Sequence, residues 1–560
     1  MSLIKDTPNQ LERLLGVDFI SYCTATTKED VLARLRAEKP LPPGAESALA
    51  RLADLCNEAV QHSATRQIPT DLLWDFFAGF DADENLSLAN AIRRQAGGQI
   101  LEPQHPDALI QALQRIAVNV YPLLLIPPSG VMPWPHVPFP MSLGSYPMAQ
   151  VAVDAILRDA DLSRLHPQFK PQDEGQDEDD PARAMSGWAV HRTIESVIIF
   201  VFNKAKLQLL AMPSAEHLCQ GIPESVATAK KLIQGKSVSL PIAIGLSNIK
   251  LPPGVTIESK LGRLSEYTYL FDSWVPVALR GNRLNQTSDQ GQYEFLRGSG
   301  DIILQMEQKS RLRFSPPEAE SYYWQLSAVD ASAANRQSII CLAITLGVSY
   351  ETPLAVIPTW AIGFSPIVTP MTNSGGFSPQ AGSQRTMAPL RVLAEEECDA
   401  WNKWISKVNS IGFKGIEVAA RRIQIAIAER YNPVDRFVDS IIAWENLFGG
   451  GSEMTFRISC SIALLLGTDS NHRRQLQKEA TELYRLRGAV VHGATQVSDG
   501  KASESASAGL EIAIKALRKI YTEKPEMIKA DSPERSLMLI LRHDPPTPEE
   551  VAPPSSNAVV

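Results

Sequence analysis

A long helical pattern near the end of the chain runs into the stretch Tyr484-Arg485-Leu486-Arg487-Gly488-Ala489-Val490-Val491-His492-Gly493. A glycine at the end of such a pattern is a typical helix stop, and Gly493 stands in that position. The stretch therefore predicts a helix over about residues 473–491 with an arginine and a histidine near its end. Apolar residues recur along this helix at steps of three and four, at Leu476, Ala480, Leu483, Leu486 and Val490.

Arg487 and His492 are the candidate catalytic residues. They are separated by five positions, about 140° around a regular helix, so they share one site only if the helix end distorts or a second chain completes it. A guanidinium group binds phosphate oxygens and stays charged, whereas an imidazole moves a proton near neutral pH. The pair suits metal-independent RNA cleavage. The imidazole would handle a proton at the 2′-hydroxyl or the leaving oxygen, and the guanidinium would stabilise charge on phosphorus.

Three blocks in a fixed order carry a resemblance to a known family. They are Pro433–Phe448, then Phe456–Ile458 with Ala463–Gly467, and finally Tyr484–Arg487 with Val491–Gly493. In this order and spacing they resemble an Apea-like HEPN domain, which is a helical bundle, over roughly residues 393–526.

The resemblance implies a function as well as a fold. In the HEPN ribonuclease superfamily the motif arginine and histidine cleave RNA, and two domains commonly face each other to build one site. This implies an endoribonuclease or toxin acting in antiphage defence or stress response, and a homodimer or higher homo-oligomer formed through these helices. Active members often carry a polar residue directly after the arginine, where this chain has Gly488.

Other residues near the motif support an RNA site. Glu445 lies on an otherwise apolar helix face, and such an acid needs a partner, for which Arg487 is the candidate. Tyr484 and Arg485 are further supporting or RNA-binding candidates. In the alternative interpretation His492 only caps the helix and Arg487 pairs with Glu445 or Glu482. The bundle would then be a non-catalytic RNA-binding or protein-docking module.

Composition limits the partners. The chain has 560 residues, 44% of them hydrophobic, and a net charge of −8, which argues against a surface that coats nucleic acid broadly. Residues 431–525 hold 12 Lys and Arg against 11 Asp and Glu, so local contact with RNA phosphates is allowed. A protein trigger is a further expected partner.

Cysteine usage and hydropathy predict a cytoplasmic protein with no membrane contact. The six cysteines are widely spaced with no C-x-x-C pair, which is typical of reduced thiols and excludes the usual zinc spacing. Neither a signal-peptide pattern nor an apolar stretch of membrane-spanning length is found. Gly235-Lys236-Ser237 imitates the end of a P-loop, but Lys230 occupies the position of its first glycine. We expect no metal and no cofactor.

The predicted fold class is α+β and multidomain. We expect a helical module at 1–100, a proline-rich connector with an acidic linker at 101–185, a β-rich domain at 186–392, the HEPN-like bundle at 393–526 and a disordered tail at 527–560. The N-terminal and β-rich parts would gate the bundle. Expected strands in the β-rich part are Val197–Phe202, Ser239–Ile244, Thr268–Phe271, Ile302–Gln305, Tyr322–Leu326 and Ile339–Leu346.

Two further expectations concern the ends of these domains. The N-terminal module resembles a helix-turn-helix, in which Asn90, Arg93 and Arg94 would meet DNA. We favour a plain helical adaptor for this module, since basic residues are not concentrated there, and a DNA-binding regulator acting through residues 28–94 is the less favoured alternative. Between His492 and a last helix at Ala506–Tyr521, the small and polar residues 494–505 predict a loop beside the site.

Overall fold

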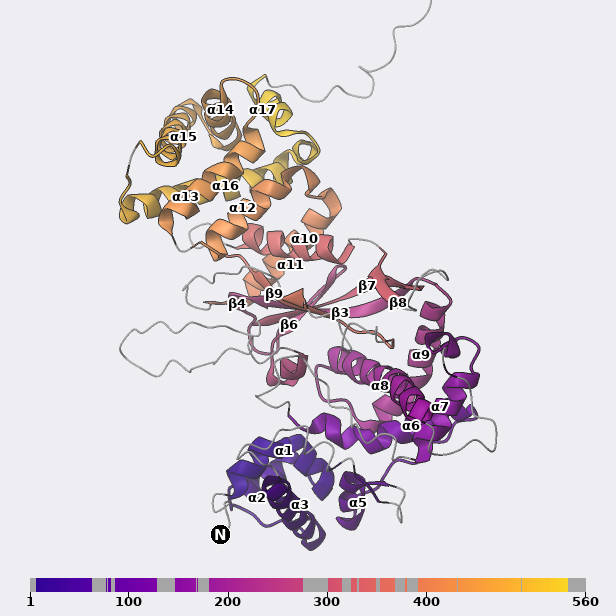
Figure 1. Ribbon diagram of the computed structural model, residues 1–560. Coiled ribbons are helices and arrows are strands. Elements are labelled where there is room, and N and C mark those ends of the chain that lie inside the picture. The colour runs from indigo at the N-terminus through magenta and orange to yellow at the C-terminus, as the bar shows by residue number, and fades with distance from the viewer. Residues whose placement is uncertain are drawn as a thin grey trace, which may run out of the picture.

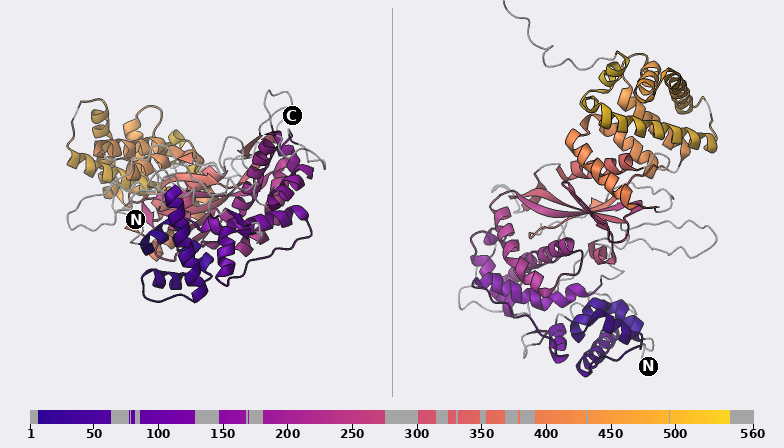
Figure 2. Two further views of the ribbon diagram at one scale, coloured as in Figure 1. Left: turned by 60° about the horizontal axis from the view of Figure 1, so that its bottom comes forward. Right: turned by 180° about the vertical axis from the view of Figure 1, so that it is seen from behind.

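The fold combines helices with one main β-sheet that crosses the middle of the molecule (Figure 1). Helices cover both faces of this sheet, and the view from behind shows the same order of layers (Figure 2). The helices that contain the candidate site lie at the end of the molecule opposite the N-terminal helices. The computed structural model describes residues 7–62, 77, 79–81, 86–127, 147–167, 169, 181–274, 301–314, 324–329, 332–348, 353–367, 378–379, 391–430, 432–494 and 496–541.

The main sheet is antiparallel and is built around the long strands β3 and β7. β3 (Val238–Ser247) pairs with β7 (Ile302–Phe314) on one side and with β9 (Ile357–Gly363) on the other. The strand order is β10-β9-β3-β7-β6-β5, and β8 also pairs with β7. The remaining strands are β5 (Ile257–Ser259), β6 (Gly262–Glu266), β8 (Trp324–Ala328) and β10 (Ser378–Pro379), with small pairings between β1 (Phe80–Asp81) and β2 (Leu86–Ser87) and between β4 (Ile249–Lys250) and β11 (Arg391–Val392).

Each face of the sheet belongs to a different hydrophobic core. Successive side chains of a strand point to opposite faces. Ile303 accordingly packs in the core shared with the N-terminal half, whereas Ile302 and Leu304 pack in the core shared with the C-terminal helices. The two cores meet at the sheet, so β3 and β7 join the halves of the molecule.

The N-terminal half is helical and shares one core. Thr27 caps its second helix by accepting a hydrogen bond from the Asp30 N–H. The elements are α1 (Thr7–Thr24), α2 (Lys28–Leu35), α3 (Pro43–His62), α5 (Leu88–Gln95), α6 (Ala108–Val120), η1 (Tyr121–Leu125), α7 (Pro147–Arg158), η3 (Leu162–Leu165), α8 (Pro181–Leu209) and α9 (Ala215–Ile233).

The C-terminal region is helical, as expected. One of its helices spans Pro433–Phe448, the predicted bounds, because Pro433 suits the first turn and the Asn432 side chain caps it. The elements are α10 (Ser332–Gly347), α11 (Glu395–Ile411), η6 (Lys414–Ile416), α12 (Glu417–Ala428), α13 (Pro433–Phe448), α14 (Met454–Leu466), α15 (Ser470–Val491), α16 (Asp499–Glu523), η7 (Pro525–Ile528) and α17 (Ser532–Ile540).

Three of the expected strands are wrong. Val197–Phe202 lies inside α8 and Ile339–Leu346 lies inside α10. All six side chains of the first run are buried. A helix buried on every side gives the same unbroken apolar run as a buried strand, which explains both errors. Thr268–Phe271 leads into a 3-10 helix, η4 (Tyr269–Trp274). The expected strands at Ser239–Ile244 and Ile302–Gln305 are confirmed, and the described part of the expected strand Tyr322–Leu326 lies in β8 from Trp324 onward.

Two boundaries of the C-terminal region are also corrected. The predicted loop at 494–505 is short, because α16 begins at Asp499, where the Ser498 side chain caps it. The expected disordered tail at 527–560 is wrong in its first part, since η7 and α17 occupy most of residues 525–540. The acidic run 173–180, the proline-dense stretch 128–146 and residues 542–560 lie outside the described residues, whereas the described rest of the predicted connector is largely helical, in α6, η1, α7 and η3.

Acid should destabilise the N-terminal half through His166. Burial lowers the pKa of His166 to about 4, and its Nε2 lies 2.9 Å from the Thr193 hydroxyl. The unfolded chain, with a histidine pKa of about 6.5, therefore binds the proton first, and stability falls as the pH drops from about 6.5 towards 4, by about 3 kcal/mol in all. We expect the thermal midpoint to fall less between pH 7 and pH 5 in His166→Gln than in the parent; an equal fall in both would contradict this.

Candidate functional site

A contact between α13 and α15 brings three of the candidate residues together. Glu445 on α13 accepts hydrogen bonds from the Tyr484 hydroxyl at 2.9 Å and from Arg487 Nη2 at 3.2 Å, both on α15. Tyr484 and Arg487 are three positions apart, so they share one side of the helix. The predicted partnership of Glu445 with Arg487 is confirmed. It also fits the alternative in which Arg487 is only paired, because Glu445 neutralises it.

The cluster is half-buried and one of its donors is free. The side chains of Arg487 and Glu445 are 21% and 20% exposed. Burial, together with the neighbouring Glu445 carboxylate, raises the pKa of Tyr484 to about 12, so the phenol stays protonated at neutral pH. Arg487 Nε is buried and has no acceptor among the described residues. A buried N–H without an acceptor is costly.

His492 lies apart from this cluster. It caps the C-terminal end of α15, where its backbone N–H donates to the Gly488 carbonyl at 3.1 Å, and its side chain is exposed. Gly493 follows with φ +68°, the left-handed conformation that favours glycine at a helix end. The helix stays regular to Val491, so the distortion that could join Arg487 and His492 is absent from the described chain. Arg485 is exposed on the outer side of α15.

A buried arginine that the sequence did not single out holds the end of α13. Arg535 on α17 is 1% exposed and donates to the carbonyls of Asn446 at 2.7 Å, Leu447 at 2.8 Å and Ala530 at 2.5 Å. The Ser532 hydroxyl adds a hydrogen bond to the Glu445 carbonyl at 3.0 Å. Carbonyls at a helix C-terminus lack partners within the helix. Residues of α17 therefore position the turn that carries Glu445.

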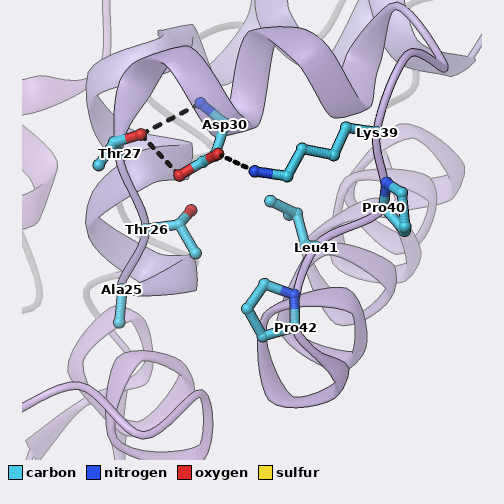
Figure 3. A pocket seen from close by; sticks show the side chains of 8 residues that line it. All are labelled: Ala25, Thr26, Thr27, Asp30, Lys39, Pro40, Leu41 and Pro42. Carbon is cyan, nitrogen blue, oxygen red and sulfur yellow. Dashed lines mark hydrogen bonds and ion pairs between the residues drawn. The ribbon is translucent and has the colours of Figure 1, made fainter.

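Two surface hollows in the described chain lie outside this cluster. The first, of about 480 Å³, lies between α1, α2 and α3 (Figure 3), where the hydroxyl of Thr27 and Lys39 lower the pKa of Asp30. Its charged groups already pair with each other, Lys39 with Asp30 at 3.0 Å. The second, of about 660 Å³, lies between α15 and α16, where Lys515 and Lys519 pair with glutamates of their own helix.

The DNA-binding alternative loses two of its three residues. Asn90 is fully buried and bonds to Tyr22 and Asn119, while Arg93 donates to the backbone carbonyls of Tyr22 and Gln99. Side chains held in this way cannot reach base edges.

The part of the chain that the structure describes contains no group of three or more His, Cys, Asp or Glu side chains that could hold a metal ion. All six cysteines are free thiols, as expected. One helical stretch in the described ranges, Ala108–Leu125, is long and apolar enough to cross a membrane, but 78% of it is buried inside the protein, as in a core helix.

Comparison of the chain with protein-family models, with curated proteins and with solved structures finds no match. The residues of the site and their geometry therefore carry the functional argument.

Arg535→Ala should loosen the end of α13. It removes three short donations from a buried guanidinium and leaves their carbonyl acceptors without partners, at a cost of about 3 kcal/mol or more. We expect faster hydrogen exchange of the amides in α17 and in the last turn of α13. Lys529→Ala, which removes an exposed cation two residues beyond Met527, is the control. Unchanged exchange in Arg535→Ala would show that α17 does not hold α13.

Proposed function

We propose that the C-terminal helical region is a metal-independent endoribonuclease of HEPN type. The observation that carries the proposal is the state of Arg487. Glu445 holds its guanidinium in a half-buried position while its buried Nε–H lacks an acceptor. A guanidinium that one carboxylate holds in place and that is still 21% exposed suits a phosphate oxygen whose charge grows in the transition state. The resemblance of the surrounding helices to a HEPN bundle supports the same assignment.

The chemistry needs one proton carrier and one charge stabiliser. The 2′-hydroxyl attacks the adjacent phosphorus, loses its proton and displaces the 5′-oxygen, which takes up a proton as it leaves. His492, exposed at the helix end, would carry one of these protons. Arg487 would stabilise the pentacovalent phosphorus. The products are a 2′,3′-cyclic phosphate and a 5′-hydroxyl.

A second copy of the chain would complete the site. Arg487 and His492 point about 140° apart on a helix that stays regular. The two side chains of one chain therefore do not reach the same phosphate. Two exposed apolar side chains on the same pair of helices support a homodimer, since Phe456 on α14 is 55% exposed and Val491 on α15 is 49% exposed. The partner's His492 would then face Arg487 across the two-fold axis. A role in defence or stress response belongs to the same proposal.

A non-catalytic RNA-binding or protein-docking module is the second candidate. The specific observation in its favour is that Glu445 already neutralises Arg487 within one chain. Gly488 also stands where active HEPN proteins often carry a polar residue. A side chain fits there, because a Cβ built on Gly488 meets nothing within 4 Å.

RNA cleavage in EDTA separates the two candidates. We expect the unmodified protein to leave 2′,3′-cyclic phosphate ends. Arg487→Ala and His492→Ala should each lower the rate by at least about 100-fold, the usual contribution of such groups. Lys403→Ala, an exposed cation on α11, is the matched control and should cleave normally.

A protein that does not cleave RNA, even with cell extract added as a source of triggers, would favour the second candidate. The variant Gly488→Ser then tests whether the glycine is the cause. A gain of RNA cleavage in this variant would show that Gly488 prevents catalysis. Mixing Arg487→Ala with His492→Ala tests the two-chain site. Partial recovery of activity is expected, because mixed dimers contain one intact site.

A further inference from the structure

The outer face of α15 carries a straight stripe of exposed cations that ends at His492. Arg474, Lys478, Arg485 and His492 are all exposed. At about 100° per residue they fall within about 40° of one line along the helix, and the line is about 27 Å long. Arg487 points about 140° away from it, towards Glu445, so the stripe and the buried cluster occupy opposite sides of one helix.

The two acids of α15 lie off this line. Glu479 is rotated about 140° from Arg474, whereas Glu482, four residues after Lys478 and three before Arg485, flanks the line on one side. The positions between the cations are Thr481 and Gly488, which are small, and a Cβ at Gly488 would meet nothing within 4 Å. Between Arg485 and His492 the positively charged surface therefore carries no large side chain. A bound strand can approach the helix backbone closely there.

Several cations of this region are paired within the chain, and the stripe cations are not. Arg422 and Arg430 both pair with the buried Asp439 at 2.7 Å, and Lys519 pairs with Glu523. By contrast, Arg474, Lys478 and Arg485 have no ion pair among the described residues. In a chain with a net charge of −8, three unpaired cations in one line point to an anion outside the chain.

Helix α15 is also unusually free of packing. Among its 22 residues only Ala480 is fully buried. The helix lies at the outer edge of the C-terminal region (Figure 1). Its outer face is therefore open along its length to a long partner as well as a small ion.

We propose that this stripe is the track on which a single RNA strand lies, with its phosphates on Arg474, Lys478 and Arg485 and its path leading to His492. A positive line that follows the backbone is how proteins bind single strands without reading sequence. One line of charges, one residue wide, matches one strand rather than a duplex. The inference rests on the proposed function for its choice of RNA, and it adds which face holds the substrate and from which end the strand reaches the histidine.

Binding can be measured without cleavage. A fluorescent 2′-O-methyl oligouridine lacks the attacking hydroxyl, so its anisotropy with the full chain reports binding alone. We expect the triple variant Arg474→Ala, Lys478→Ala, Arg485→Ala to bind at least about tenfold more weakly. The slope of log Kobs against log salt should become shallower by about 2, because each phosphate contact on a single strand contributes about 0.7. Alanine favours helix, so the variant should retain α15, which circular dichroism checks.

A matched triple variant controls for net charge. Lys403→Ala, Lys501→Ala and Lys529→Ala remove three exposed cations from the same region but off α15, and this variant should bind like the parent. Glu482→Lys adds a cation beside the stripe and should tighten binding. If both triple variants bind the oligouridine equally weakly, or if the stripe triple variant binds it as tightly as the parent, the proposed RNA track is wrong. Binding to phosphatidylserine vesicles in place of the RNA would overturn it in favour of a membrane surface.

The two proposals fail separately. If RNA binding depends on the stripe but the protein never cleaves RNA, the proposed RNA track is supported and the proposed ribonuclease activity is contradicted. Cleavage that depends on Arg487 and His492, together with binding that ignores the stripe, would do the reverse.

Discussion

The structure depends on burying both faces of an antiparallel sheet. Such sheets often leave one face to water, but the alternating residues of β3 and β7 supply apolar side chains to a core on each side. The helices of both halves are therefore anchored to the same two strands. The C-terminal helices share their core with one sheet face, and the Trp401 indole N–H donates to the Ile340 carbonyl, which ties α11 to α10. The sheet face and the helices that carry Glu445 and Arg487 therefore belong to one continuous core.

Much of the fold could be predicted wherever local signals agreed with each other. The helix Pro433–Phe448 was predictable because an N-terminal proline, a capping asparagine and a following glycine all mark the same bounds. The runs at Val197 and Ile339 were not, because burial on all sides removes the periodicity that separates a helix from a strand. The errors follow from the two-sided core, since it is deep enough to bury whole helices.

The pairing of Glu445 with Arg487 could be predicted from the sequence, but the contacts of Arg535 that hold the end of α13 could not. An acid at Glu445 on an apolar face required a partner, and Arg487 is that partner. The role of Arg535 was missed because the proline-rich end of the chain predicted a disordered tail from residue 527. That prediction overrode the signal for a helix start just before Arg535. Asp531 followed by Ser532 and Pro533 is a capped helix start, and the Asp531 side chain accepts from the Glu534 N–H. A buried arginine that caps another helix is a tertiary contact, and no local pattern in the sequence indicates it.

The pairing of Arg487 with Glu445 does not by itself argue against catalysis. Arg487 contacts the carboxylate through Nη2, and its side chain is 21% exposed, so Glu445 does not cover the whole guanidinium. Tyr484 occupies the other carboxylate oxygen and, with its raised pKa, remains a donor at neutral pH. Glu445 is therefore held from two sides, and in the proposed function a phosphate would bind the exposed part of the guanidinium with Glu445 in place. On this reading the carboxylate orients Arg487, and its charge keeps a half-buried arginine stable until the substrate arrives.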